Sequence, residues 1–179
     1  VDWPGNNIKF WKSPETKWRW ILYDIDFGAA IWNQSAAFSN TLSFALNPNG
    51  PNWPNPPWST FLFRRLVTNQ TFRNRFVNHI ADVINSRFLP QPVINRINSH
   101  VNSVRAEISR QDNRWSRNGN WNENVEQIRD FFRDRPAQMK GFIRDQFNLP
   151  AHHRLNIRIN DTDEGYVKVN SLDIDATNW

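Results

Sequence analysis

The sequence predicts an α+β fold that is mainly helical, and three observations support this. Residues rich in β-formers occur at 8–11 and 17–23, on either side of a short polar turn. Apolar residues then recur at helical spacing between 59 and 147. Near the end of the chain, from Leu155 onward, apolar residues alternate with polar ones as they do in a strand. The expected order is a hairpin, a long loop, about five helices and a small β unit.

The N-terminal hairpin is predicted by its composition and by its turn. The segments Ile-Lys-Phe-Trp (8–11) and Lys-Trp-Arg-Trp-Ile-Leu-Tyr (17–23) carry β-branched and aromatic side chains, and the polar residues 12–16 separate them. The following segment, 29–58, shows little periodicity and is crowded with Asn, Pro and Gly after Asn47. We expect a long irregular loop there, and loops of that length are usually functional or mobile.

Five helices are expected in the middle of the chain, each introduced by a capping residue or a proline. Pro136 is placed at the start of a helix of its own, because proline cannot donate a hydrogen bond inside a helix. The last segment predicts a second hairpin, with strands at 155–159 and 166–169 joined by a turn at 161–165. The chain is accordingly divided into a domain at 1–151 and the start of a small β unit at 152–179. The expected helix starts are Ser59 or Thr60, Thr71, Pro92, Asn122 and Pro136.

Composition limits the classes of function. The 179 residues contain no Cys, which excludes disulfides, thiolate metal sites and a cysteine nucleophile. No run of about 18 apolar residues occurs, so no membrane span is expected. The net charge of +5 is typical either of an anionic partner or of solvated helix faces. No nucleic-acid motif accompanies the pairs Arg64-Arg65 and Arg73/Arg75, so we expect salt-bridged helix faces there and no nucleic-acid partner.

The residues that point to chemistry surround the first hairpin. Asp2 is followed after four residues by Asn7, and Asp26-Phe27-Gly28 comes directly after the second expected strand. Protein kinases place a catalytic Asp, an Asn and an Asp-Phe-Gly in this order around a hairpin. Phosphoryl transfer needs a carboxylate to orient the acceptor hydroxyl, and Asn and Asp oxygens are ligands that Mg²⁺ accepts. In a chain so rich in Asn the first spacing also arises by chance, and Asp-Phe-Gly also fits a simple turn after a strand.

Longer runs around these residues resemble the CotH kinase family of spore-coat proteins. The likeness is carried by residues 3–11 (Trp-Pro-Gly-Asn-Asn-Ile-Lys-Phe-Trp) and 17–28, and continues through 62–66, 72–76 and 114–136, so that it covers nearly the whole chain. It implies a fold similar to the C-terminal lobe of a protein kinase. It also implies ATP- and Mg²⁺- or Mn²⁺-dependent phosphorylation of Ser in coat or surface proteins, by exported bacterial proteins of the cell envelope or extracellular space.

The resemblance also implies roles for single residues. Asp2 corresponds to the catalytic Asp and Asn7 to a metal ligand, while Asp24 and Asp26 are both candidate metal ligands. We favour Asp26 as the principal ligand, since alternation along a strand would place both carboxylates on one side. Asn6 is a candidate contact to the nucleotide, or simply a turn residue.

Two features of the kinase pattern are missing from the sequence. A glycine-rich loop over the phosphates and a strand-borne Lys paired with a helix Glu would have to lie upstream of Val1, so we expect the chain as given to be inactive. The alternative is a non-catalytic surface or spore-coat module that binds a glycan or a protein, with Trp53, Trp58, Trp115 and Trp121 as sugar-stacking candidates. A third hypothesis is an anion or nucleic-acid binder that depends on Arg.

Overall fold

The computed structural model describes residues 2–116, 119–157 and 165–174, and in them the α+β, mainly helical fold is confirmed. Two antiparallel hairpins, β1–β2 and β3–β4, flank a body of helices. The elements are β1 (Ile8–Trp11), β2 (Arg19–Leu22), the 3-10 helix η1 (Gln34–Phe38), α1 (Thr41–Leu46), α2 (Phe61–Leu66), α3 (Gln70–Ile84), α4 (Pro90–Val104), the 3-10 turn η2 (Arg105–Glu107), α5 (Ile108–Trp115), α6 (Trp121–Phe147), β3 (Val167–Val169) and β4 (Leu172–Ile174).

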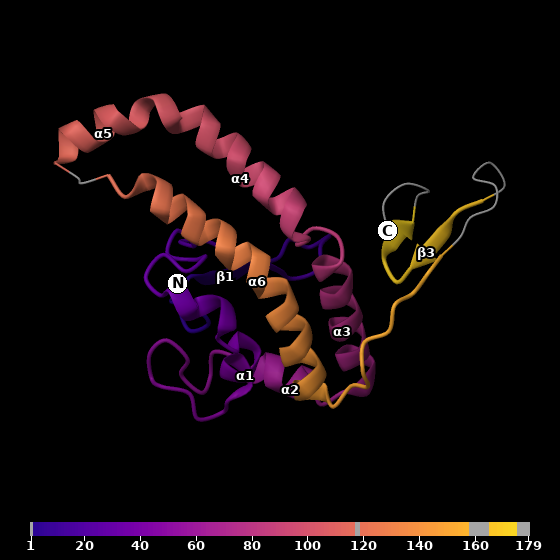
Figure 1. Cartoon of the computed structure of the whole chain (residues 1–179). Coiled ribbons are helices and arrows are strands. Elements are labelled where there is room, and N and C mark those ends of the chain that lie inside the picture. The colour runs from indigo at the N-terminus through magenta and orange to yellow at the C-terminus, as the bar shows by residue number, and fades with distance from the viewer. Residues whose placement is uncertain (1, 117–118, 158–164, 175–179) are drawn as a thin grey trace.

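Helix α6 lies at the centre of the helical body, where it contacts η1, α1, α3 and α4 (Figure 1). It lies beside α4, where Arg129 donates hydrogen bonds of 3.0 and 2.7 Å to Asn98 Oδ1. Its other end reaches the core, in which buried side chains of α1, α3 and α6 meet: Leu42, Ile84 and Ile143. Partly buried residues complete this core: Leu46, Phe63, Phe76, Val77, Ile80, Met139 and Phe147.

Pro136 lies inside α6, so the prediction of two separate helices around it is wrong. Val125 and Ile143 are buried on either side of the proline and hold both halves of the helix against the body. An internal proline costs a helix about 3 kcal/mol. Burial of two large apolar residues offsets a cost of that size, at about 1.5–3 kcal/mol for each. Tertiary packing therefore continues a helix that local propensity would end.

Other helix starts differ slightly from those expected, and α6 begins at Trp121, after Asn120 rather than after Asn122. Asn69 rather than Thr71 caps α3, because its Oδ1 accepts from Phe72 N at 3.0 Å. Helix α4 begins at Pro90 instead of Pro92. Thr60 precedes α2 as predicted, but its hydroxyl accepts from Arg64 rather than from the backbone, at 2.6 Å.

The expectation of an irregular loop at 29–58 is wrong for its first half, which contains η1 and α1. Its second half is fixed by Asn55, whose side chain is fully buried. Asn55 Nδ2 donates to Phe44 O at 2.6 Å, and Asn55 Oδ1 accepts from Ser59 Oγ at 2.8 Å. Buried amides of this kind are stable only when they are hydrogen-bonded. The loop is therefore attached to the end of α1.

The N-terminal hairpin is confirmed, with Ile8 opposite Leu22 and Trp11 opposite Arg19. The predicted C-terminal hairpin is wrong in its pairing. Strand β3 pairs with β4, and residues 155–157 belong to no strand, while 158–164 lie outside the described residues. The turn at Asn170-Ser171 determines this pairing, because it binds the buried carboxylate of Asp82 on α3.

Among the described residues, charged side chains form ion pairs along α6, and none is present at the expected pairs Arg64-Arg65 and Arg73/Arg75. Glu126 binds Arg129 and Arg133, and the hydrogen bonds from these two guanidinium groups lower the pKa of Glu126. Arg64 donates to Thr60 and to Pro57 O and so stabilises the start of α2. No described helix is both long and apolar enough to cross a membrane.

Candidate functional site

The loop that carries Asp2 is closed by two backbone hydrogen bonds. Asn6 N donates to Asp2 O at 2.9 Å, and Gly5 N donates to Pro54 O at 2.7 Å. A Cβ atom at Gly5 would lie 2.6 Å from Pro54 O and 2.7 Å from Pro56 Cδ, so only glycine permits this approach. The loop at 2–7 is therefore fixed against the proline-rich segment, which Asn55 in turn attaches to α1. The Asp2 side chain itself is exposed.

Asn7 lies at the base of the hairpin, beside the residues that leave β2. Its side chain is buried, and its Nδ2 donates to Asp24 O at 3.3 Å. Tyr23 N donates to Asn7 O at 3.5 Å, which extends the ladder one step below Ile8. Asn7 has a φ of 56°, in the left-handed region that asparagine tolerates better than most residues. The hairpin thus brings Asn7 next to the backbone of Asp24, two residues before Asp26.

The backbone from Asp24 to Asp26 does not continue the strand. Strand β2 ends at Leu22, and Asp24 has a φ of 54°. The argument that strand alternation places Asp24 and Asp26 on one side is therefore wrong, because it depends on extended backbone through both residues. Both carboxylates are exposed, and Gly28 N donates to Ile25 O at 2.9 Å to close a turn around Asp26.

The segment after this turn is held by α6. Ala29 and Ala30 have φ values of 52° and 69°, a conformation that costs a residue with a Cβ atom about 1–2 kcal/mol. Gln127 on α6 donates to Ala30 O. Four residues farther on, η1 begins at Gln34, and its C-terminal end is bound by Arg135. Two consecutive strained alanines persist because contacts from a long helix determine the path of the chain.

Arg135 is the residue of this region that the sequence did not single out. Its Nη1 donates to Ala37 O at 2.8 Å and Ser39 O at 2.6 Å, and its Nη2 donates to Thr41 Oγ1 at 2.7 Å. Burial lowers the pKa of this guanidinium. Arg135 belongs to the segment 114–136, which resembles the family, and directly precedes Pro136. A helical pattern alone does not show which loop an arginine will bind.

The outer part of the hairpin exposes large apolar side chains. Phe10, Trp18 and Trp20 are 61%, 63% and 63% exposed, and the Phe10 ring lies edge-on to both indoles at 5.6 Å. The opposite face pairs cations with rings, with Lys9 Nζ 5.3 Å from the centre of Tyr23. Exposed apolar surface of this kind marks a site of interaction.

The donors near the base of the hairpin suit a hard divalent cation in their chemistry. Asp2, Asp24 and Asp26 supply carboxylate oxygens, and Asn7 supplies an amide oxygen. Among the described residues, no group of three or more acidic or histidine side chains forms a ready metal site. For ATP, no Gly-x-Gly sequence occurs anywhere in the chain, so no loop resembles the phosphate-binding loop of a kinase.

Comparison with known proteins gives one match. A family model described as CotH kinase protein matches residues 1–139, which include β1, β2 and most of the helical body. No curated protein and no solved structure matches the chain significantly.

Proposed function

The chain belongs to the CotH kinase family, and we propose that its N-terminal loop and hairpin form the metal- and acceptor-binding part of an ATP-dependent protein phosphotransferase. The acceptor would be a Ser hydroxyl of a coat or surface protein. The observation that carries the proposal is the position of Asn7 against Asp24, with Asp26 two residues farther along the chain. The proposal also includes a location in the bacterial envelope or outside the cell, and the division at 151/152.

Each residue has a proposed task. Asp2 is exposed on a loop that is fixed at Gly5, so its carboxylate can orient the acceptor hydroxyl and accept its proton. Asn7 and Asp26 supply oxygen ligands, with Asp24 as a further ligand and Asn6 as a contact to the nucleotide. A bound Mg²⁺ or Mn²⁺ would neutralise charge on the phosphate oxygens. Because Asn7 donates its amide N–H to Asp24, its amide oxygen remains the atom suited to a cation.

Metal binding tests the central part of the proposal. Mn²⁺ is titrated into the full chain with and without ATP, and free Mn²⁺ is measured by electron paramagnetic resonance. Asp26→Asn is expected to weaken Mn²⁺ binding about tenfold, since one charged ligand is worth on the order of 1.4 kcal/mol or more. Because ATP itself binds Mn²⁺, a titration without protein is subtracted, and a shared site then appears as additional bound Mn²⁺, since coupling between two ligands is reciprocal.

Asp145→Asn is the matched control, because Asp145 is an exposed carboxylate on α6 that pairs only with its neighbour Arg144 among the described residues. Equal Mn²⁺ affinity in the Asp26 and Asp145 variants would contradict the assignment of Asp26. Retained Mn²⁺ binding without any effect of ATP would show that this chain holds a metal but not the nucleotide, as its lack of a glycine-rich loop predicts.

A second function is favoured by the tryptophans of the loop beside the site. Trp53 and Trp58 are 58% and 70% exposed, on the segment that Asn55 and Gly5 hold in place. Rigid exposed indoles suit stacking against sugar rings. In this alternative the chain is a glycan-binding surface module. Titration with N-acetylglucosamine oligomers would then show binding that Trp58→Ala removes, while Mn²⁺ binding stays unchanged.

A further inference from the structure

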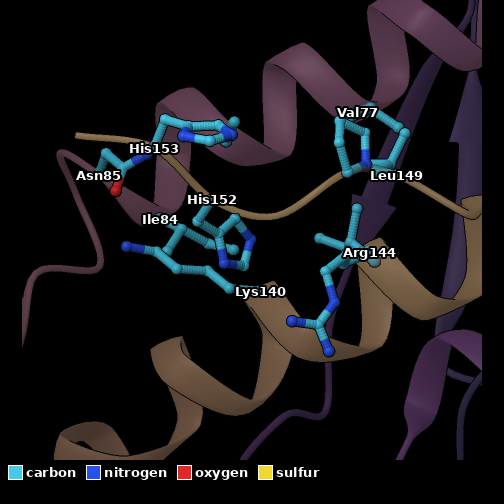
Figure 2. Close-up of a pocket in the computed structure, with 11 residues that line it drawn as sticks. Val77, Ile84, Asn85, Lys140, Arg144, Leu149, His152 and His153 are labelled. Atoms are coloured by element: carbon cyan, nitrogen blue, oxygen red, sulfur yellow. The ribbon is translucent and has the colours of Figure 1, made fainter. Parts of the chain in front are cut away.

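A groove lies between α3, α6 and the chain that follows α6, and no residue of β1 or β2 lines it (Figure 2). Its volume is about 550 Å³, within the range of small-molecule sites. The floor is apolar and comes from both helices, with Val77, Ala81 and Ile84 on α3 and Ile143 on α6. Leu149, just after the end of α6, extends this apolar surface along the crossing chain. The floor therefore suits an elongated apolar group.

The rim of the groove carries only cationic or neutral polar side chains. Lys140 and Arg144 come from α6, and His152 and His153 come from the crossing chain. In Figure 2 the side chains of His152 and Lys140 lie beside Ile84, and Arg144 lies below Leu149. Among the described residues no Asp or Glu lines the groove, although Asp145 pairs with Arg144 at its edge, 3.0 Å away. The rim therefore favours a negative charge.

The chain that crosses the groove precedes the β3–β4 hairpin, which is bound to α3, one of the helices of the floor. Beyond the crossing chain, the β3–β4 turn binds Asp82, which is buried and follows Ala81 directly. Asn170 Nδ2 donates to Asp82 Oδ1 at 2.9 Å, and Ser171 N donates to Asp82 Oδ2 at 3.0 Å. Ser171 Oγ also donates to Asp82 Oδ2, at 2.6 Å. Hydrogen bonds to a carboxylate are among the stronger ones in proteins, so the β3–β4 turn is held on α3 beside Ala81 of the floor.

We propose that this groove binds an amphipathic anion of the fatty-acid class, with its chain on the α3–α6 floor and its carboxylate at Lys140 and His152. A small inorganic anion would leave the apolar floor in contact with water. A wholly apolar ligand would remove water from the cations of the rim without pairing them, which is unfavourable. One carboxylate on a long alkyl chain satisfies both surfaces. The His152-His153 pair, which the kinase-like function does not use, then has a role in recognising the head group.

Isothermal titration calorimetry on the full chain tests this, with decanoate as the probe and decanol and acetate as its two halves. Decanoate is expected to bind at one site per chain, decanol at least about tenfold more weakly, and acetate without measurable heat. Lys140→Gln is expected to weaken decanoate binding about tenfold and to leave decanol unchanged. Ala81→Phe, which fills the floor, is expected to weaken both. Lys12→Gln is the control, because Lys12 lies in the β1–β2 turn.

Several results would overturn the proposal. Equal affinity for decanoate and decanol would show that the rim does not recognise the head group. Acetate binding as strong as that of decanoate would show a simple anion site. Absence of decanoate binding, or binding that neither Lys140→Gln nor Ala81→Phe weakens, would show that the groove is not the site. Thermal unfolding of each variant, at a midpoint equal to that of the parent chain, establishes that these outcomes do not arise from misfolding.

Discussion

The hairpin that carries the candidate site and the helical body are stabilised in opposite ways. In the body, Leu42, Ile84 and Ile143 from three different helices are each 6% exposed. On the hairpin, Phe10, Trp18 and Trp20 are each more than 60% exposed. An isolated two-stranded hairpin is marginally stable in water. The β1–β2 hairpin therefore depends on its base, where Gly5 and Asn7 connect it to neighbouring segments.

This difference indicates that the chemistry of the candidate site and the stability of the fold reside in separate residues. The site is placed by a few polar contacts at the base of the hairpin, and those contacts come from a loop that α1 and α6 hold. Segments with few buried apolar contacts open at lower free energy than the core. The predictions below measure that separation, beginning with the largest effect.

The largest effect is expected in the core. Ile143→Ala should lower the free energy of unfolding by about 2–5 kcal/mol, because it leaves a cavity against Leu42 and Ile84. Trp20→Ala removes a larger side chain but should change the same quantity by less than about 1 kcal/mol, since it loses chiefly its contact with Phe10. Urea unfolding followed by far-ultraviolet circular dichroism measures both. A Trp20→Ala effect as large as that of Ile143→Ala would show that the two regions share one core.

The next largest change in stability is expected from substitutions of two glycines. Gly5→Ala should destabilise the chain by about 1–3 kcal/mol, because its Cβ would meet the backbone oxygen of Pro54. Gly141→Ala should stabilise it by about 0.5–1 kcal/mol, because Gly141 lies inside α6 with no atom within 4 Å of the added Cβ. Hydrogen exchange should show faster exchange of β1 and β2 amides in Gly5→Ala only. Unchanged exchange there would mean that Pro54 does not fix the loop.

Asp82→Asn should produce a smaller and pH-dependent effect, of about 1–2 kcal/mol near neutral pH. Burial raises the pKa of Asp82, but hydrogen bonds from the Ser171 side chain, Asn170 and the Ser171 backbone outweigh it, and the pKa is below the ordinary value of 3.8. The carboxylate thus stabilises the fold above pH 3.8, and this contribution is lost as the pH falls through its lowered pKa. The difference in unfolding free energy between the parent chain and the variant should shrink across that range. A difference independent of pH would contradict the role of the charge.

The parts of this fold that depend on neighbouring residues could be predicted from the sequence. The parts that depend on contacts between residues far apart in the chain could not. The first hairpin follows from its β-formers and the polar turn at 12–16, which act within a few residues. Helix α1 was not predicted, because it is only six residues long and the flanking sequence is rich in Asn and Pro. It is held by Asn55, 11 residues after its partner Phe44, and by Arg135, 94 residues after Thr41. The pairing of β3 with β4 similarly depends on Asp82, more than 80 residues earlier.

For the candidate site, the order of the motif predicted that the hairpin would bring Asn7 and Asp26 to the same cation, and the contact present is from Asn7 Nδ2 to the backbone oxygen of Asp24. The orientation of the carboxylates was not predictable, because Asp24 leaves the strand in a left-handed conformation that no alternation pattern reveals. The convergence of Asp2, Asn7 and Asp26 on one cation stays a prediction, which Mn²⁺ binding tests.

The smallest effect is expected where the hairpin joins the body. Ala29→Gly should raise the free energy of unfolding slightly, by up to about 1 kcal/mol, because a φ of 52° strains alanine but not glycine. The gain is limited by the greater freedom of glycine in the unfolded chain, which costs about 0.5–1 kcal/mol. Ala137→Gly is the matched control on the exposed side of α6, and it should destabilise the chain by about 1 kcal/mol. Urea unfolding of both variants gives effects of opposite sign if the strain is located at the junction. Equal destabilisation by both would show that the chain after Asp26 relaxes out of the left-handed conformation in solution, and that α6 does not determine its path.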